Sequence, residues 1–164
     1  MREEKTNVMR TLDQKKIPYT PRFYPHREGE AVDGASVARL LGQDPEAVFK
    51  TLVTRGASKA HHVFVIPVLA ELDLKRAARA AGEKSVELIH VKELLPLTGY
   101  VRGGCSPIGM KKRLPTVIDE AALEQEAIAV SAGKIGAQVE LSPRDLAALT
   151  GAAFARVTRD GEGP

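Results

Sequence analysis

The sequence predicts a single α/β domain in which helices flank a mixed β-sheet. Its 164 residues are enough for one domain with a sizeable core. Segments with helical periodicity alternate irregularly with strand-like segments, and the strands cluster late in the chain. This order favours a mixed sheet over a regular, doubly wound parallel sheet. We therefore expect one domain over residues 1–160 and a disordered tail over residues 161–164.

The first fifty residues are predicted to form two helices, an extended segment and a helical turn. Val8, Met9 and Leu12 would share one face of a helix over about residues 5–16, which two following prolines end. The next elements expected are a short strand or extended segment over 22–26, a helix over 35–41, and a helical turn that begins at 44–46.

A β-hairpin is predicted near the middle of the sheet. Residues 48–54 and 62–68 have strand composition, and a turn over 55–59 joins them. Three elements are expected after it: a helix from the N-cap Asp73 to about residue 80, a brief strand over 86–89, and a short helix over 91–97.

The last third of the chain is predicted to supply most of the remaining strands. Short strands are expected over residues 116–118, 127–130, 138–141 and 154–158. Ser142 and Pro143 begin a final helix, because serine is a favoured N-cap and proline fits the first turn.

The composition limits the function classes. Hydrophobic residues make up 43% of the chain and charged residues 27%, and no apolar run approaches the ~20 residues of a membrane span. The start lacks the apolar region of a signal peptide, and a lone cysteine rules out an internal disulfide. We expect a cytoplasmic protein without a membrane partner. The net charge of +3 permits a nucleic-acid partner, although 4% aromatic residues argue against base-stacking platforms.

The stretch over residues 98–115 is the richest in backbone-shaping residues, with four glycines and two prolines. Gly103 and Gly104 permit a positive φ and leave no Cβ between the backbone and a ligand. Pro107 stiffens the loop, so its amides suit an anion or a polarised carbonyl. A turn with a solvated basic flank is the alternative. Met110 stands where a P-loop requires lysine, so nucleotide hydrolysis is not indicated.

Lys50 is the candidate cation for a binding site. It lies in a predicted strand, on the face opposite to Phe49 and Val53. Two interpretations remain open. The side chain either points to solvent at a sheet edge, or lies in a cleft and binds a substrate oxygen or phosphate.

The other candidate groups do not form a recognisable catalytic set. Cys105 lies near cations that would activate a thiol, but no histidine is near in sequence, which favours a small apolar filler. Ser131 is either a turn residue or a hydroxyl in the same cleft as Lys50. The four histidines lack metal-ligand spacing, so we expect no metal and no cofactor.

The chain resembles the YbaK/EbsC family of free-standing aminoacyl-tRNA deacylases, which are related to the editing domain of prolyl-tRNA synthetase. The resemblance covers residues 5 to 160, and its closest branch comprises Cys-tRNA(Pro)/Cys-tRNA(Cys) deacylases. The segments that carry it, in family order, are 5–10, 48–52, 72–75, 98–100, 103–109, 111–115 and 131–134.

The resemblance implies a mixed, partly barrel-like sheet flanked by helices, and it implies roles for residues. Lys50 would be the essential site lysine, and the loop from Gly103 to Pro107, including Gly104 and Ser106, would face the aminoacyl ester. The matched pocket positions are Tyr24, Thr51, Ser131 and Gln138. Two positions depart from the best-known members, because Asp33 replaces an aromatic residue and Gln138 replaces an acid. The reaction type therefore follows more firmly than the amino acid.

The implied activity is the clearance of cysteine mischarged onto tRNA(Pro), with prolyl-tRNA synthetase as a possible partner and no indication of oligomeric state. The substrate's own thiol would attack its ester, so the enzyme needs no nucleophile. Lys111, Lys112 and Arg113 would contact the tRNA backbone. Two alternatives remain open: a related deacylase that uses water on another substrate such as Ala-tRNA(Pro), and a non-catalytic tRNA- or synthetase-binding module.

Overall fold

The structure is a computed structural model that describes residues 4–160. The expected disordered tail, 161–164, lies outside the described residues. The described helices are α1 (Asn7–Gln14), α2 (Gly34–Leu41), α3 (Leu74–Ala81), α4 (Val91–Thr98) and α5 (Pro143–Thr150), with 3-10 helices η1 (Pro45–Ala47) and η2 (Glu120–Glu124). Within residues 4–160 no helix is long and apolar enough to cross a membrane.

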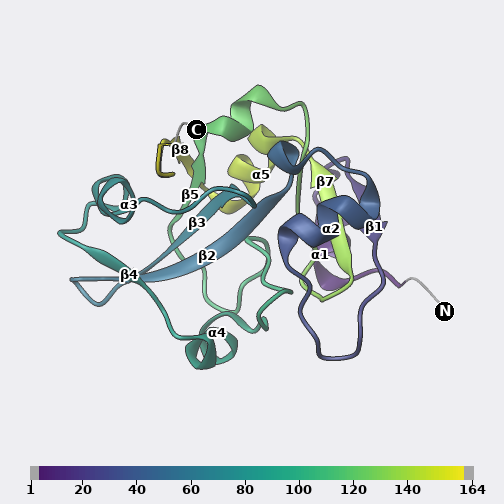
Figure 1. The fold of residues 1–164 in the computed structure, drawn as a ribbon, viewed down its shortest axis with the longest axis horizontal. Coiled ribbons are helices and arrows are strands. Elements are labelled where there is room, and N and C mark those ends of the chain that lie inside the picture. Colours follow the sequence, from purple (N-terminus) through teal and green to yellow (C-terminus); the bar gives the residue numbers. More distant parts are fainter. Residues whose placement is uncertain (1–3, 161–164) are drawn as a thin grey trace.

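The strands form two sheets, as Figure 1 shows, so the expectation of one mixed sheet was wrong in this respect. The strands are β1 (Thr20–Phe23), β2 (Phe49–Gly56), β3 (His61–Pro67), β4 (Val86–Leu88), β5 (Thr116–Asp119), β6 (Ile128–Ser131), β7 (Ala137–Leu141) and β8 (Ala153–Ala155). Their orders are β4-β2-β3-β5-β8 and β1-β7-β6.

The two sheets meet at a seam between β2 and β6. Val48, just before β2, pairs with Ala129 of β6 in a single parallel bridge. The strands pair no further, so the sheets stay separate and no closed barrel forms. The larger sheet is mixed, as predicted, because β2 and β3 are antiparallel while β3, β5 and β8 are parallel. The α/β fold class is thus confirmed.

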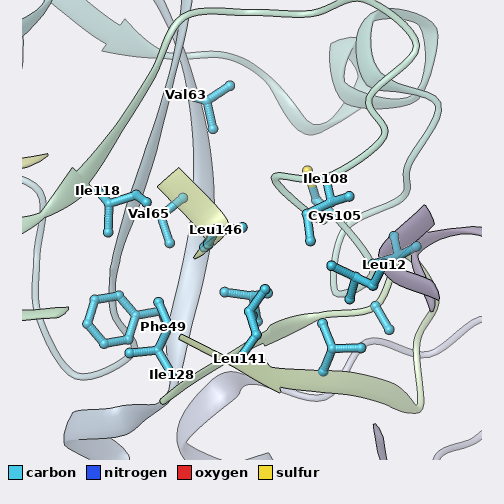
Figure 2. Packing of buried hydrophobic residues seen from close by; sticks show 14 of the residues in the cluster. Leu12, Phe49, Val63, Val65, Cys105, Ile108, Ile118, Ile128, Leu141 and Leu146 are labelled. Carbon is cyan, nitrogen blue, oxygen red and sulfur yellow. The ribbon is translucent and has the colours of Figure 1, made fainter. Parts of the chain in front are cut away.

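The main hydrophobic core lies between the two sheets. Val65 and Ile118 come from the larger sheet, and Ile128 and Leu141 come from the smaller one. Figure 2 shows Leu146 of α5 between these two groups. All five side chains are at most 2% exposed. Burial of a side chain of this size stabilises the fold by about 1.5–3 kcal/mol, so the core fixes the seam between the sheets.

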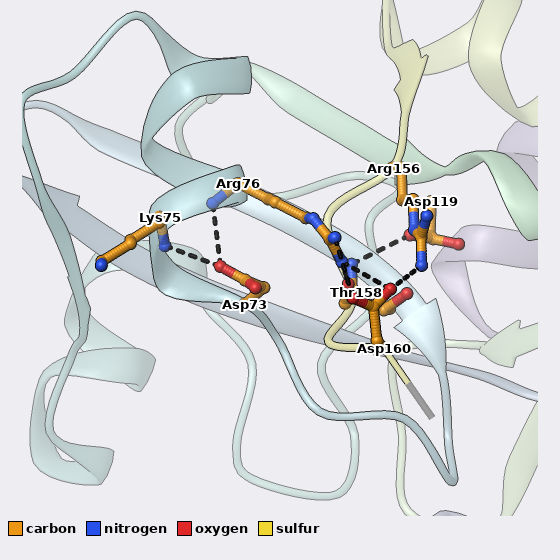
Figure 3. A network of polar contacts seen from close by, with 7 residues as sticks. All are labelled: Asp73, Lys75, Arg76, Asp119, Arg156, Thr158 and Asp160. Carbon is orange, nitrogen blue, oxygen red and sulfur yellow. Dashed lines mark hydrogen bonds and ion pairs between the residues drawn. The ribbon is translucent and has the colours of Figure 1, made fainter. Parts of the chain in front are cut away.

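A buried carboxylate fixes the end of the described chain. Asp119 is 2% exposed, and its Oδ1 accepts hydrogen bonds from the backbone N–H groups of Val157 (2.9 Å) and Thr158 (3.2 Å). Its Oδ2 accepts from the Ala121 N–H at 3.0 Å. Arg76 of α3 donates to the Thr158 carbonyl oxygen at 2.7 Å (Figure 3). The segment after β8 is therefore held by hydrogen bonds, and the predicted strand over 154–158 ends earlier than expected.

The predicted helix ends are confirmed where cap chemistry indicated them. Asp73 and Ser142 accept hydrogen bonds from backbone amides in the first turns of α3 and α5. Gly42 and Gly82 end α2 and α3 in the left-handed region. Glycine reaches this region without the strain that a Cβ would add, which is why the sequence located these ends.

Candidate active site

A cavity of about 130 Å³ opens at the seam between the two sheets. After the Val48–Ala129 bridge, β2 and β6 are no longer paired. Lys50 of β2 and Ser131 of β6, each two residues beyond the bridge, line the cavity between the strands. Other walls come from Tyr24 just after β1, the start of α2, the glycine loop and β7. A cavity of this volume suits a small side chain.

Lys50 lies in the wall of this cavity, and its binding of a substrate oxygen or phosphate stays a prediction. β4 pairs with β2 only at Thr54–Gly56, so it does not cover Lys50. The side chain of Lys50 makes no hydrogen bond or ion pair with any residue in the described range, and the nearby Glu71 is bound to Arg159 at 2.8 Å. Partial burial lowers the pKa of Lys50, and the charge of Glu71 opposes part of this shift.

Two hydroxyl groups line the same cavity. The Oγ1 of Thr51 is buried and has no hydrogen-bond partner in the described chain. The Oγ of Ser131 accepts a hydrogen bond from the Gly133 N–H at 3.1 Å. Ser131 is therefore both a turn residue and a cavity residue, so its two interpretations hold together. An unpaired buried hydroxyl is costly to the fold, which makes Thr51 a ready partner for a bound molecule.

The glycine loop reaches the cavity through Gly103 and Cys105, whereas Gly104, Ser106 and Pro107 do not line it. Gly103 has φ +86°, and a Cβ there would lie 2.8 Å from the Cβ of Ala31. A Cβ on Gly104 would lie 3.1 Å from the backbone nitrogen of Ile135. Three segments thus cross at these two glycines.

The three loop residues outside the cavity are all buried. The Ser106 Oγ accepts a hydrogen bond from the Ile108 N–H at 3.2 Å, which turns the chain after Pro107. The Gly104 N–H donates to the Val101 carbonyl oxygen at 2.9 Å. These contacts hold the loop in shape, so the three residues support the cavity wall from behind.

Cys105 is a poor candidate for a nucleophile. The residue is 9% exposed, and burial raises the pKa of its thiol to about 12. A thiol of this kind is protonated at neutral pH, and only the thiolate is an effective nucleophile. The structure therefore agrees with the interpretation of Cys105 as a small apolar filler.

Tyr24 and Gln138 line the cavity from the smaller sheet. Tyr24 is 7% exposed, and burial raises the pKa of its hydroxyl. Gln138 is 5% exposed, and its Oε1 accepts a hydrogen bond from Gln43 Nε2 at 2.8 Å. Tyr24 also borders a larger groove of about 660 Å³, which His26 and Lys134 help to line.

Asp33 does not line the cavity, although the resemblance placed it at a pocket position. Its carboxylate accepts hydrogen bonds from the N–H (2.9 Å) and the hydroxyl (2.8 Å) of Ser36 and so caps α2. Its neighbours Val32 and Gly34 line the cavity instead. Asp33 therefore acts as an N-cap, which frees the flanking residues to form the wall.

The three cations expected to bind tRNA lie at the far end of the larger sheet. Pro115, which follows the three cations, lies beside Val63 of β3, because its carbonyl oxygen accepts a hydrogen bond from Val63 N–H. Lys50 lies beside Ile66, toward the other end of β3. Lys112 is close enough to His61 to help burial lower the pKa of that imidazole. A Cβ on Gly151 would lie 2.9 Å from Arg113, so this guanidinium packs at the end of α5. The cations Lys111, Lys112 and Arg113 do not line the cavity.

The cavity offers hydrogen-bond donors and no acid–base pair. Its titratable lining groups are Lys50, Tyr24 and Cys105; burial raises the pKa of the Tyr24 hydroxyl and of the Cys105 thiol, so neither of these two is a base at neutral pH. In residues 4–160 no group of three histidines, cysteines or acids could hold a metal ion. The site can therefore polarise and orient a bound group.

Comparison with known proteins identifies the family. A model described as an aminoacyl-tRNA editing domain matches residues 28–149. The chain belongs to the aminoacyl-tRNA editing domain family. This editing domain is also 48% identical, over 156 residues, to EbsC of Enterococcus faecalis (strain ATCC 700802 / V583), provisionally named a Cys-tRNA(Pro)/Cys-tRNA(Cys) deacylase. The match covers 95% of this chain and 94% of EbsC.

Solved structures share the fold of the editing domain. The hypothetical protein APE2540 has a TM-score of 0.83 and 26% identity, covering 94% of this chain and 100% of that chain. A candidate trans-editing enzyme for prolyl-tRNA synthetase has a TM-score of 0.80 and 24% identity, covering 96% and 99%. The second likeness concerns the fold alone. The family and fold expected from the sequence motifs are thus confirmed.

Three residues that lie outside the motifs and line or support the cavity were missed in the sequence analysis. Ala31 packs against Gly103, Val32 lines the cavity, and Gln43 binds Gln138. Ala31 and Val32 lie between predicted elements, and Gln43 lies 95 residues before its partner. The only local signal was Gly42, which marks a helix end and so fixes the chain just before Gln43.

Proposed function

We propose that the editing domain cleaves the ester of Cys-tRNA(Pro), which removes cysteine attached to the wrong tRNA, and that it also accepts Cys-tRNA(Cys). The observation that carries the proposal is the 48% identity to EbsC, which extends over nearly all of both chains. A synthetase pocket distinguishes near-isosteric amino acids by only ~1–3 kcal/mol, so a second enzyme is needed to remove the errors.

The size of the cavity supports a small aminoacyl group. About 130 Å³ is well below the ~300–1,000 Å³ of ligand pockets that enclose a drug-sized molecule. The nucleotide that carries the ester would therefore remain outside. The neighbouring groove of about 660 Å³, which shares Tyr24 with the cavity, has room for it. This arrangement suits an enzyme that reads the amino acid inside and the end of the tRNA outside.

The chemistry we propose uses the thiol of the substrate. The cysteine sulfur attacks the ester carbonyl carbon, the bond from that carbon to the ribose oxygen breaks, and the thiol proton goes to the ribose oxygen. Water then opens the thiolactone to free cysteine. This route fits a cavity in which Cys105 stays protonated and which no described histidine, aspartate or glutamate lines. Orientation of the thiol toward the carbonyl can supply ~7–11 kcal/mol of barrier reduction.

Two groups of the protein would stabilise the negative charge that develops on the ester oxygen. Lys50 supplies an unpaired ammonium group in the wall, and the loop supplies backbone N–H groups. The Gly104 N–H is used within the loop, while those of Gly103 and Cys105 have no partner among the described residues. We assign the role of anion binding to Lys50 and the two free amides, and contacts with the substrate to Tyr24, Thr51, Ser131 and Gln138.

Association with prolyl-tRNA synthetase belongs to the same proposal. A free-standing enzyme that clears Cys-tRNA(Pro) must act before the product is used in translation. The solved trans-editing enzyme of similar fold is described in relation to that synthetase. Cleavage measured with and without the synthetase tests this part of the proposal by itself.

A panel of aminoacylated tRNAs tests the proposed reaction. We expect Cys-tRNA(Pro) and Cys-tRNA(Cys) to be cleaved far faster than Ser-tRNA or Ala-tRNA(Pro), and a thiolactone to be trapped first. S-alkylated Cys-tRNA should bind and stay intact. Rapid cleavage of the S-alkylated substrate to free S-alkylcysteine would replace the thiol route by a water route. Binding of all tRNAs without cleavage would indicate a non-catalytic module.

A further inference from the structure

We infer that Gln43, which lies outside the cavity, positions Gln138 so that the NH₂ group of its amide faces the substrate. The inference rests on the proposed deacylase function and adds a positioning residue to it. It follows from a chain of contacts that runs from Arg22 through Glu140 and Gln43 to Gln138.

Gln43 is held in place by the end of α2. Gly42 adopts φ 65°, and the Gln43 N–H donates to the Ala38 carbonyl oxygen at 2.8 Å. This capping pattern fixes the backbone of the residue after the glycine. The side chain of Gln43 therefore starts from a defined point and reaches over to β7.

The charge of Glu140 decides which end of the Gln43 amide faces β7. Glu140 is ion-paired with Arg22 at 3.2 Å, so it is a carboxylate that only accepts hydrogen bonds. Gln43 Nε2 donates to Glu140 Oε2 at 2.9 Å and to Gln138 Oε1 at 2.8 Å. The reverse orientation would place an amide oxygen against the carboxylate. Gln43 Oε1 is buried without a hydrogen-bond partner in the described chain. The hydrogen bond to Glu140 therefore orients the amide even though the amide oxygen stays unpaired.

The orientation of Gln43 sets that of Gln138 in turn. Because the Oε1 of Gln138 is bound to Gln43, its Nε2 is left for the cavity, which Gln138 lines. Gln138 Nε2 has no hydrogen-bond partner among residues 4–160. The cavity thus gains an amide donor besides Lys50 and the hydroxyl groups, at a position where an acid would have been an acceptor.

A donor at this position suits an acceptor on the substrate. The ester carbonyl oxygen is such an acceptor, and it gains negative charge when the carbonyl carbon is attacked. We therefore assign Gln138 Nε2 to that oxygen. Gln43 never touches the substrate and acts only through Gln138, so its effect should fall on kcat more than on KM.

Three substitutions of Gln43 test the inference with Cys-tRNA(Pro). Gln43→Leu removes the donor and should lower kcat at least tenfold with little change in KM. In Gln43→Glu the new carboxylate repels Glu140 and turns the Gln138 amide, so kcat should be no higher than in Gln43→Leu. Gln43→Lys keeps a donor for both oxygens and should stay within a few-fold of the wild type. Gln14→Leu, at an exposed glutamine of α1, is the matched control.

A structural readout separates this inference from the proposed function. The side-chain NH₂ resonances of Gln138, assigned through Gln138→Ala, should shift in Gln43→Leu and stay near the wild-type position in Gln43→Lys. Equal kcat in the wild type and Gln43→Leu would overturn the inference, as would a Gln43→Lys variant that is as slow as Gln43→Leu. A wild-type enzyme that cleaves no tRNA would overturn the proposed function, and the resonances would then decide on Gln43 alone.

Discussion

Lys50 carries the only unpaired ammonium group in the wall of the cavity. A partly buried cation without a partner costs folding free energy, because it loses hydration that no carboxylate replaces. Its presence in the wall therefore indicates a role toward a bound molecule. The lowered pKa of Lys50 has the same cause, since burial disfavours the charged form.

Lys50→Ala should separate activity from stability. We expect kcat/KM for Cys-tRNA(Pro) to fall by about 10²–10³-fold, the usual cost of one donor to a developing oxyanion. The melting temperature should stay equal or rise, because the substitution removes a partly desolvated charge. Lys75→Ala, at an exposed lysine of α3, is the control and should change neither. Near-wild-type turnover of Lys50→Ala would remove Lys50 from the site.

Cys105→Ala should keep most of the activity. The thiol is buried and its pKa is raised to about 12, so it is protonated at the pH of the reaction. We expect kcat/KM within a few-fold of the wild type, measured beside circular dichroism to show that the fold is kept. Complete loss of cleavage in a folded variant would instead favour a mechanism that uses the enzyme thiol.

At the scale of single residues, the sequence motifs indicated positions that line the cavity, while the roles of these residues stay predictions. Lys50, Gly103 and Ser131 lie far apart in the sequence and line one cavity. Gln43 could not be predicted, because a contact between two glutamines 95 residues apart leaves no local pattern. Asp33 was assigned to the pocket because motif matching gives a position in the chain and not the direction of a side chain.

Among the elements, the glycine loop depends on its fit to the segment before α2. Gly103 combines φ +86° with a Cβ position 2.8 Å from Ala31. A side chain there would first push the two segments apart, so the ester would be affected only indirectly. Gly29 is the matched control, because it has φ +72° and nothing within 4 Å of a Cβ.

Gly103→Ala should cost more stability than Gly29→Ala. Both substitutions add the ~1–2 kcal/mol of a left-handed residue, and only the first adds a clash. Urea unfolding measures the difference, and kcat/KM should fall for Gly103→Ala alone. Ala31→Gly in the Gly103→Ala background should restore part of the lost stability and part of the lost kcat/KM. Equal costs at the two glycines would show that the loop does not depend on Ala31.

The turn end of the β2–β3 hairpin holds the shielded carboxylate of Glu83. Glu83 binds His62 Nε2 at 2.8 Å and the Ser58 hydroxyl at 2.5 Å, and its side chain is 7% exposed. The hydrogen bonds from Ser58 and then from His62 lower the pKa of Glu83 from 4.5 to about 2. A pKa that folding lowers stabilises the fold above the unfolded value and loses this effect as the pH falls.

Glu83→Gln should therefore change how stability depends on pH. The difference in unfolding free energy from the wild type should be constant above about pH 5.5 and shrink between pH 4.5 and 2. Denaturant unfolding over this range measures it. Glu87→Gln, at an exposed carboxylate of β4, is the control. A difference that is unchanged down to pH 2 would contradict the proposed cause.

The elements themselves were predictable because most carry local signals. Asp73, Ser142 and the glycines after α2 and α3 mark helix ends through cap chemistry alone. The division into two sheets was not predictable, because it depends on where β6 leaves β2. The turn η2 was missed for a similar reason, since its cap is the buried Asp119, which the sequence presents only as the end of a strand.

Over the whole molecule, the cavity and the basic segment Lys111–Arg113 lie at opposite ends of the β2–β3 hairpin. From Lys50 to Arg55 the strand spans five residues, or about 17 Å. We propose that the ester enters the cavity while the acceptor stem extends toward Lys111 and Lys112. Arg113 contributes less in this arrangement, because it packs at the end of α5.

Lys111→Ala and Lys112→Ala together should weaken binding of every tRNA by a similar factor. Each lost phosphate contact should reduce the slope of log K against log salt by about 1. Cleavage of a small cysteine ester should not change, because the cavity is untouched. Fluorescence titration over a salt series measures the slope. An unchanged slope would place the tRNA on another face.

The residues that form the cavity wall are spread along the chain from Tyr24 to Gln138, which matters while the chain is synthesised and when it is cleaved. β7, which carries Gln138, lies between β1 and β6, so β1 lacks its partner until β7 has been synthesised. The cavity of a growing chain therefore stays incomplete until β7 has been synthesised. A protease cut within this span would likewise divide the wall between two fragments.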